Sequence, residues 1–269
     1  MGEVEEKGLK NIVQYGLKAV LDLFIPRKCI VCERSLGVEE LHLCRECHDD
    51  IPHTYYWVRK FNPMADRFNA LIQEELEREA VKKSQLTHEG YAFATALFFY
   101  RADSDYSHIS RQLKYHSNLP AGRFFGRLLG GKLAMAEHLS DVDAVIPIPL
   151  HWTRKWTRGY NQAEVIAREV AKVIGVPLRT DILERCRRTR TQTKLTIEGK
   201  AANVQGAFRV RRSHKKADAS AFSDLKHLLI IDDIFTTGST ALACYSALRD
   251  TFPPSVRISI ATLGFVGEA

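Results

Sequence analysis

An apolar strand that leads into two acids and a hydroxyl-rich turn, at residues 228–240, constrains the fold of this chain most strongly. Residues 228–231 are all apolar, which is typical of a parallel strand that is covered on both faces. Asp232 and Asp233 follow, and a helical pattern runs over residues 240–250. Because parallel strands need crossover connections, this strand, turn and helix predict an α/β fold.

The rest of the chain extends this α/β pattern. Further strands are expected at residues 91–100, from residue 142 to a break at Pro147 and Pro149, and at residues 256–263. Helices are expected at residues 107–116, 119–139 and 161–174, the last ending at Gly175. Strands that alternate with helices predict a mainly parallel sheet with helices on both faces.

The turn after the acid pair has the composition of a phosphate site. Backbone amides at a helix start lack partners within the helix, and a glycine lets a ligand approach the backbone closely. The acids cannot bind phosphate, but they can accept hydrogen bonds from a vicinal diol. A sugar phosphate satisfies both requirements. The predicted binding residues are Asp232, Asp233, Thr236, Thr237, Gly238, Ser239 and Thr240.

Three other interpretations of this turn fit the sequence less well. A nucleoside triphosphate P-loop needs Lys beside the Ser or Thr, and none is present here. A response-regulator acidic pair needs a phosphorylated Asp tens of residues later, and too little chain follows Asp233. Simple helix capping accounts for Ser239 or Thr240 but not for the doubled Asp.

Two Cys-x-x-Cys pairs lie near the N-terminus and are separated by eleven residues. Each pair aims two thiolates at one ion, and together they complete a tetrahedral structural zinc site with no open position. The predicted ligands are Cys29, Cys32, Cys44 and Cys47. His42 and His48 are alternative ligands. Cys186 and Cys244 are expected to be ordinary thiols, since no secretory signal favours disulfides.

Charge is concentrated in one segment. The chain carries a net charge of +7, and residues 185–216 contain eleven Lys and Arg against one acid, Glu198. Such a concentration favours a polyanionic ligand, either a phosphorylated small molecule or nucleic acid. Within this region residues 185–203 are expected to form a mobile loop, and residues 211–224 a second surface loop.

These patterns predict four regions. Residues 1–25 form an amphipathic helix that docks on the protein, because its polar face is not rich in cations. Residues 26–60 form the zinc module, residues 61–88 a linker with a mostly exposed helix at 65–83, and residues 89–269 the main domain. The start is acidic and no segment is long and apolar enough for a membrane span, so a cytoplasmic location is expected.

The sequence at residues 232–240, Asp-Asp-Ile-Phe-Thr-Thr-Gly-Ser-Thr, resembles the ribose-phosphate loop of type I phosphoribosyltransferases. On this resemblance residues 146–149 correspond to the pyrophosphate loop, residues 185–203 to a flexible hood, and the region of Gly264 to a fourth loop. The main domain is therefore expected to be phosphoribosyltransferase-like.

Taken together, motifs along almost the entire chain resemble the ComF family of amidophosphoribosyltransferase-like proteins. Besides the cysteines and the turn, these motifs are Leu113-Lys114-Tyr115, Pro147-Ile-Pro149, Arg158-Gly-Tyr-Asn-Gln162, Gln192-x-x-Leu195 and Asn203-Val-Gln-Gly-Ala-Phe208. One departure is Lys200, where the family's pattern has Arg, so the charge is kept but bidentate contact with phosphate is lost.

The resemblance implies roles for particular residues. Asp232 and Asp233 would hold the ribose hydroxyls of phosphoribosyl pyrophosphate (PRPP), and residues 236–240 its 5-phosphate. Lys114, Arg154 and Arg158 would contact the pyrophosphate, with plain surface charge as the alternative for Lys114 and Arg154. Magnesium would accompany PRPP, and catalysis would rest on positioning and charge stabilisation rather than on a protein nucleophile.

Two functions fit these expectations. One is an enzyme of nucleotide metabolism, a glycosyltransferase that transfers phosphoribose to an amine or nucleobase. The other is a non-catalytic protein of DNA uptake in natural competence, which binds single-stranded DNA, uses the pocket as a sensor and has partners in the uptake machinery. For that second role Tyr55, Tyr56 and Trp57 offer stacking surfaces, although such aromatic residues more often pack a small domain against its neighbour.

Overall fold

The computed structural model describes residues 25–83, 90–115, 118–150, 156, 159–186, 206–211 and 225–267. Nearly all of the predicted N-terminal helix, Arg154, Arg158, residues 187–203 of the predicted hood and most of the second surface loop lie outside these residues. Within the described residues, no helix combines the length and the apolar character needed to cross a membrane.

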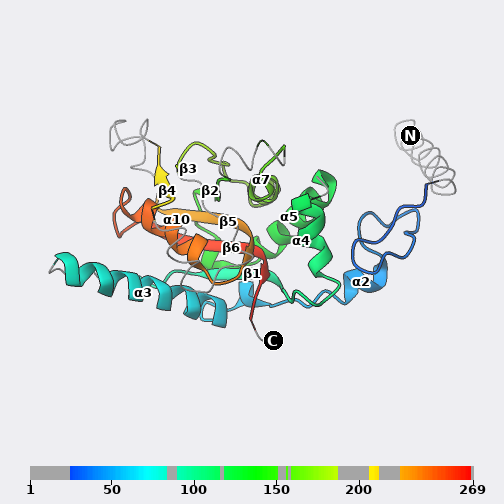
Figure 1. Ribbon diagram of the computed structural model, residues 1–269, viewed down its shortest axis with the longest axis horizontal. Coiled ribbons are helices and arrows are strands. Elements are labelled where there is room, and N and C mark those ends of the chain that lie inside the picture. Colours follow the sequence, from blue (N-terminus) through cyan, green and yellow to red (C-terminus); the bar gives the residue numbers. More distant parts are fainter. Residues whose placement is uncertain are drawn as a thin grey trace, which may run out of the picture.

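A four-stranded sheet forms the centre of the protein (Figure 1). Its strands are β1 (Ala94–Phe99), β6 (Arg257–Phe265), β5 (His227–Phe235) and β2 (Ala144–Pro147), in that spatial order. All three strand pairs are parallel, which confirms the predicted α/β fold. A second sheet pairs β3 (Leu183–Arg185) with β4 (Phe208–Val210) in antiparallel fashion.

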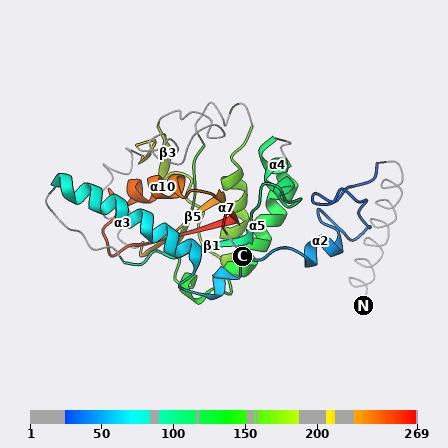
Figure 2. The same ribbon diagram turned by 60° about the horizontal axis from the view of Figure 1, so that its bottom comes forward.

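Strand β5 alternates between two cores. Leu228 and Ile230 lie in the core shared with α3 (Pro63–Lys83) and α10 (Ser239–Arg249). Leu229 and Ile231 lie in the core shared with α5 (Leu119–Leu133) and α7 (Gln162–Ile174). The two helix pairs therefore cover opposite faces of the sheet, and β5 lies between them in both views (Figures 1 and 2).

The predicted boundaries shift at two elements. Strand β5 was expected to end before the acids, but it continues to Phe235 because Asp232 and Ile234 still pair with Thr262 and Gly264 of the equally long β6. The expected helix at residues 119–139 is instead α5 followed by a short 3-10 helix, η2 (Glu137–Leu139). Helix α7 ends as predicted at Gly175, which adopts a left-handed φ of 76°.

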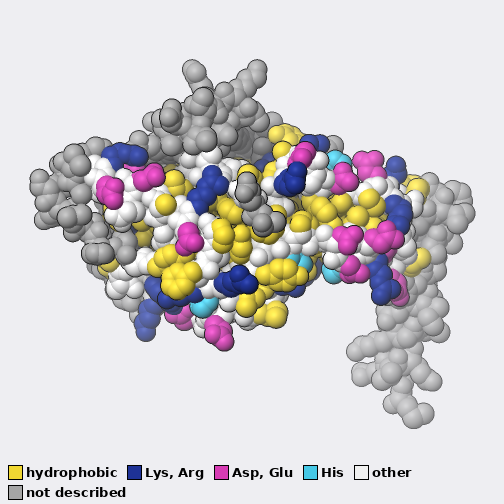
Figure 3. Space-filling model, turned by 90° about the horizontal axis from the view of Figure 1, so that it is seen from below, with side chains coloured by type: hydrophobic (Ala, Val, Ile, Leu, Met, Phe, Trp, Pro, Cys, Tyr) yellow, Lys and Arg dark blue, Asp and Glu magenta, His cyan; other side chains and the backbone are white. Residues whose placement is uncertain are grey.

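Helix α3 is more than the exposed linker that its charged composition suggests. Met64, Phe68 and Ile72, spaced four residues apart, are buried in the core beneath it. Seen from below, the α3 side of the molecule carries a band of hydrophobic side chains with Lys and Arg among them (Figure 3). The first half of α3 is therefore a part of the main core.

The cysteine-rich region lies beside α4 (Ser107–Tyr115) and α5. Tyr106, just before α4, donates its hydroxyl to the Cys47 carbonyl at 2.9 Å. The ring of His42 makes an edge contact with Phe124 of α5, with 5.5 Å between the ring centroids. A continuous layer of side chains therefore joins this region to the helices of one sheet face.

Candidate functional site

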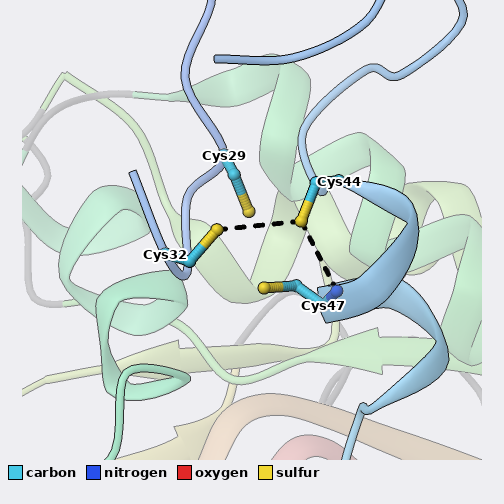
Figure 4. A group of neighbouring side chains, drawn as sticks. All are labelled: Cys29, Cys32, Cys44 and Cys47. Atoms are coloured by element: carbon cyan, nitrogen blue, oxygen red, sulfur yellow. Dashed lines mark hydrogen bonds between the residues drawn. The ribbon is translucent and has the colours of Figure 1, made fainter. Parts of the chain in front are cut away.

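The four cysteines of the two pairs converge on one point (Figure 4). Cys29 and Cys32 lie in a loop, and Cys44 and Cys47 lie at the start of α2 (Arg45–Asp49). All four sulfurs are within 4.8 Å of one another, and the Sγ atoms of Cys32 and Cys44 are 3.7 Å apart. Four sulfurs at about 2.3 Å from a zinc ion in a tetrahedron are about 3.8 Å apart. The donor set and its spacing therefore fit zinc.

Local backbone structure orients the thiols. The Cys29 amide donates to the Arg34 carbonyl at 2.8 Å, and the Glu33 amide donates back to the Cys29 carbonyl at 3.0 Å. Burial, together with the neighbouring thiols, raises the pKa of Cys47 well above its usual value. Thiolates gathered so closely repel one another, so a cation is the natural partner of this cluster.

Two predicted groups meet at the carboxyl edge of the sheet, where ligands bind in open α/β folds. Asp232 and Asp233 lie near the carboxyl end of β5, and Lys114 reaches them from the last turn of α4. The Lys114 ammonium lies 2.7 Å from Asp233 Oδ2. The structure thus places Lys114 against the acid pair.

The charges of this edge influence one another. Burial and the neighbouring Asp233 carboxylate raise the pKa of Asp232 to about 7, against the opposing effect of Lys114. Burial acts to lower the pKa of Lys114, but Asp233 and Asp232 outweigh it and raise that pKa above its usual value. Lys114 therefore stays charged, while Asp232 exchanges its proton near neutral pH.

The turn after β5 presents backbone donors. The Ser239 amide lies 3.4 Å from Thr237 Oγ1, which in turn is 2.9 Å from Ser239 Oγ. For the amides of Thr236, Thr237, Gly238 and Thr240, the described part of the chain records no hydrogen-bond acceptor. These donors can therefore turn to a ligand.

Gly238 allows this turn for two reasons. It adopts a left-handed φ of 81°, and a Cβ there would lie 2.5 Å from Leu71 Cδ1 and 2.6 Å from Phe235 Cζ. Neither the conformation nor the space suits another residue. The contact with Leu71 also shows that α3 supports the turn from behind.

Several supporting residues had no individual role in the sequence analysis. The Tyr160 hydroxyl donates to the Leu113 carbonyl and so holds the backbone beside Lys114. The Asn161 side chain donates to the Ile148 carbonyl at 2.9 Å and steadies the predicted pyrophosphate loop. The positive charge of Arg185 of β3 also acts on Asp232 and opposes the rise of its pKa. Tyr160 and Asn161 lie in the Arg158-Gly-Tyr-Asn-Gln162 motif, which marked them in the sequence but did not indicate which residues they contact.

Comparison with known proteins finds similar proteins that carry two different names. No protein-family model matches the chain. "Competence protein F" of Haemophilus influenzae is 24% identical over 229 residues, which cover 84% of this chain and 92% of that protein. "DNA utilization protein YhgH" of Salmonella typhi is 29% identical over 144 residues, 51% of this chain and 60% of that protein. The YhgH of Escherichia coli K12 is 26% identical over 137 residues, 50% and 56% of the respective lengths.

The match with Competence protein F runs through most of both chains, and the structure adds the four-cysteine cluster and the parallel sheet that the motifs predicted. The YhgH matches, although they span little more than half of those relatives, agree with it. The chain is similar to Competence protein F over most of its length, and this likeness agrees with the resemblance to the ComF family that the motifs carry.

Proposed function

We propose that this protein serves DNA uptake by binding single-stranded DNA, and that its carboxyl-edge pocket binds PRPP or a related sugar phosphate. The relatives' names, which refer to competence and DNA utilization, support the first part. The second part rests on one observation, the meeting of two carboxylates, one ammonium group and a row of uncommitted amides at a single sheet edge.

Each half of a sugar phosphate has a complementary group in this pocket. Amides and hydroxyls of residues 236–240 would bind the phosphate, and the helix dipole of α10 adds to their attraction. Asp232 and Asp233 would accept hydrogen bonds from the ribose diol. Lys114 would turn from Asp233 to the pyrophosphate, and magnesium, when bound with PRPP, would offset the remaining negative charge of that group.

The PRPP pocket is tested by calorimetric titration with PRPP and magnesium. The wild type is expected to bind, and Asp232→Asn with Asp233→Asn is expected to bind at least about tenfold more weakly, because two charge-assisted hydrogen bonds are lost. Asp103→Asn with Asp105→Asn, in the exposed segment before α4, is the matched control. Equal affinities for the wild type and the Asp232 and Asp233 variant would remove the pocket assignment.

Transfer of phosphoribose to an amine or nucleobase is the second candidate for the same pocket. It is favoured by the position of Lys114, a half-buried cation where the charge of a departing pyrophosphate would develop. Release of pyrophosphate from PRPP in the presence of ammonia or adenine, and its loss in Lys114→Met, would support this activity. PRPP that stays intact with both acceptors would leave a binding protein only.

The DNA role draws on charge and on exposed rings. The segment 185–216 holds most of the chain's basic excess. Of the three adjacent aromatic residues, Tyr56 is buried against Phe99 and Phe265, and Trp57 is buried in the core cluster that includes Cys29 and Cys44, whereas the Tyr55 side chain is exposed. Only Tyr55 is therefore free to stack on a base.

Binding of single-stranded DNA is expected to weaken steeply as salt rises, because phosphate contacts release counterions. Arg187→Gln with Arg188→Gln is expected to lower affinity and to reduce the slope of log K against log salt by about one to two, since each neutralised phosphate contributes about 0.7 for a single strand. Fluorescence anisotropy of a labelled oligonucleotide measures both. Arg78→Gln on α3 serves as the control, and a salt-independent affinity would contradict the proposal.

A further inference from the structure

A cavity lies at the amino ends of the strands of the main sheet, at the edge opposite the acid pair. His227 and Arg257 begin β5 and β6, and Arg249 ends α10, and all three line the cavity. Its volume is about 310 Å³, near the lower end of the range for ligand pockets. Because the acid pair and the hydroxyl turn stand at the carboxyl end of β5, this cavity is a separate site.

Three cations line the cavity, namely Lys60, Arg249 and Arg257, and no Asp or Glu is among its lining residues in the described part of the chain. Arg249 Nη1 donates to the carbonyls of Pro253 at 2.7 Å and Val256 at 3.0 Å. Those bonds hold the guanidinium in place, so little conformational entropy is lost when an anion binds.

Arg257 is positioned by a polar network at the base of the cavity. It forms an ion pair with Asp141, and its Nη2 lies 3.1 Å from His227 Nδ1. His227 is buried, with Nε2 2.7 Å from Ser259 Oγ. Burial lowers the pKa of His227 to about 4, so this ring adds hydrogen bonds and no charge at neutral pH. Three cations and no carboxylate line the cavity in the described residues, although Asp141 pairs with Arg257 outside the lining.

Lys60 differs from the two arginines. No carboxylate of the described residues lies within ion-pair distance of its ammonium, which is 5.6 Å from the centre of the Phe61 ring. Such a lysine is available for a phosphate group, and its replacement should disturb the fold little.

Aromatic rings stand next to this lysine. Phe61 is 65% exposed, and its ring packs on that of Tyr91, which lines the cavity, with 4.9 Å between centroids. The Tyr91 hydroxyl donates to Asp66 at 2.7 Å, which fixes the ring. An exposed ring on a fixed support, beside cations, is the combination that binds a base and its phosphate.

We propose that this amino-edge cavity is a nucleotide site, in which Lys60, Arg249 and Arg257 bind a phosphate group and Phe61 and Tyr91 support the base. The same chemistry can come from a free nucleotide or from one nucleotide of a DNA strand. Only the second source rests on the proposed DNA function.

The test titrates the full chain with thymidine monophosphate, with a six-residue thymidine oligonucleotide and with inorganic phosphate. The wild type is expected to bind the monophosphate. Lys60→Met with Phe61→Ala is expected to bind it at least about tenfold more weakly, since a charge contact and a stacking contact are both lost. The side chains of Lys60 and Phe61 are both exposed, so the fold should tolerate their replacement. An unchanged melting temperature would verify that the variant folds.

The control is Lys172→Met on α7, which should bind like the wild type. Tighter binding of the oligonucleotide than of the monophosphate would identify a strand as the source, and equal binding a free nucleotide. Inorganic phosphate that binds as tightly as the monophosphate, or full affinity in the Lys60 and Phe61 variant, would overturn the nucleotide assignment.

The test separates this site from the two proposed above. Asp232→Asn with Asp233→Asn should lose PRPP but keep the monophosphate. Arg187→Gln with Arg188→Gln should weaken the oligonucleotide but not the monophosphate. Loss of the monophosphate in either variant would contradict a separate cavity, whereas failure of DNA binding alone would leave it standing.

Discussion

Replacement of Cys29 and Cys47 by Ser is expected to abolish zinc binding and to lower the free energy of unfolding by several kcal/mol. Structural zinc sites bind with apparent free energies of about 10–16 kcal/mol, and that binding is coupled to folding. The described part of the zinc module contains little regular secondary structure. Its helices are the five-residue α2 and the three-residue η1 (Tyr56–Val58). Its apolar residues, such as Leu43, are buried against the core beside α5, so the loss should reach the main domain.

Metal analysis and thermal unfolding measure this effect. The wild type should carry about one zinc per chain, and a strong chelator should lower its melting temperature as the double substitution does. Cys186→Ser, at an exposed thiol outside the cluster, is the control and should retain both zinc and stability. A double variant that melts like the wild type would show that the cluster is not a structural metal site.

Asp232→Asn is expected to stabilise the free protein at pH 7 while it weakens PRPP binding. The folded-state pKa of Asp232 is about 7, against 3.8 for the ordinary carboxyl group. Between these values the folded state keeps the proton that the unfolded state releases, so stability falls as pH rises from about 4 to 7. Asn removes this penalty, and the expected gain at pH 7 is on the order of 4 kcal/mol, because each pKa unit corresponds to about 1.4 kcal/mol.

Denaturant unfolding at pH 5 and pH 7 tests this expectation. The gain from Asp232→Asn should be clear at pH 7 and smaller at pH 5. At pH 5 the carboxyl of the folded protein is protonated, and the pH lies closer to the ordinary pKa of 3.8, so keeping the proton costs less free energy. Asp103→Asn, at an exposed aspartate paired with Arg101, should not reproduce the gain. If Asp232→Asn destabilises the protein at pH 7, the charged Asp232 carboxylate does not reduce the stability of the ligand-free protein, and this expectation is wrong.

Local patterns were enough for the features that depend on neighbours in sequence. The two Cys-x-x-Cys pairs predicted a cluster that the structure brings together. The apolar run before Asp232 predicted a strand of a parallel sheet, and Gly175 marked the end of α7. Each of these signals comes from a conformation or ligand geometry that a few adjacent residues determine.

The features that sequence reasoning missed depend on distant partners. The extension of β5 past Asp232 comes from pairing with β6, and the burial of the α3 stripe comes from the sheet beneath it. The contact between Lys114 and Asp233 joins residues more than a hundred positions apart. No local pattern encodes such contacts, and the amino-edge cavity likewise combines residues from several strand and helix ends.

The most direct test of the central claim follows backbone amide signals of the labelled protein by NMR while PRPP and magnesium are added. We expect the amides of Thr236, Thr237, Gly238 and Thr240 to shift most and to saturate together, while those of His227 and Arg257 at the other sheet edge stay unchanged. Saturable binding that leaves the 236–240 amides unmoved would contradict it.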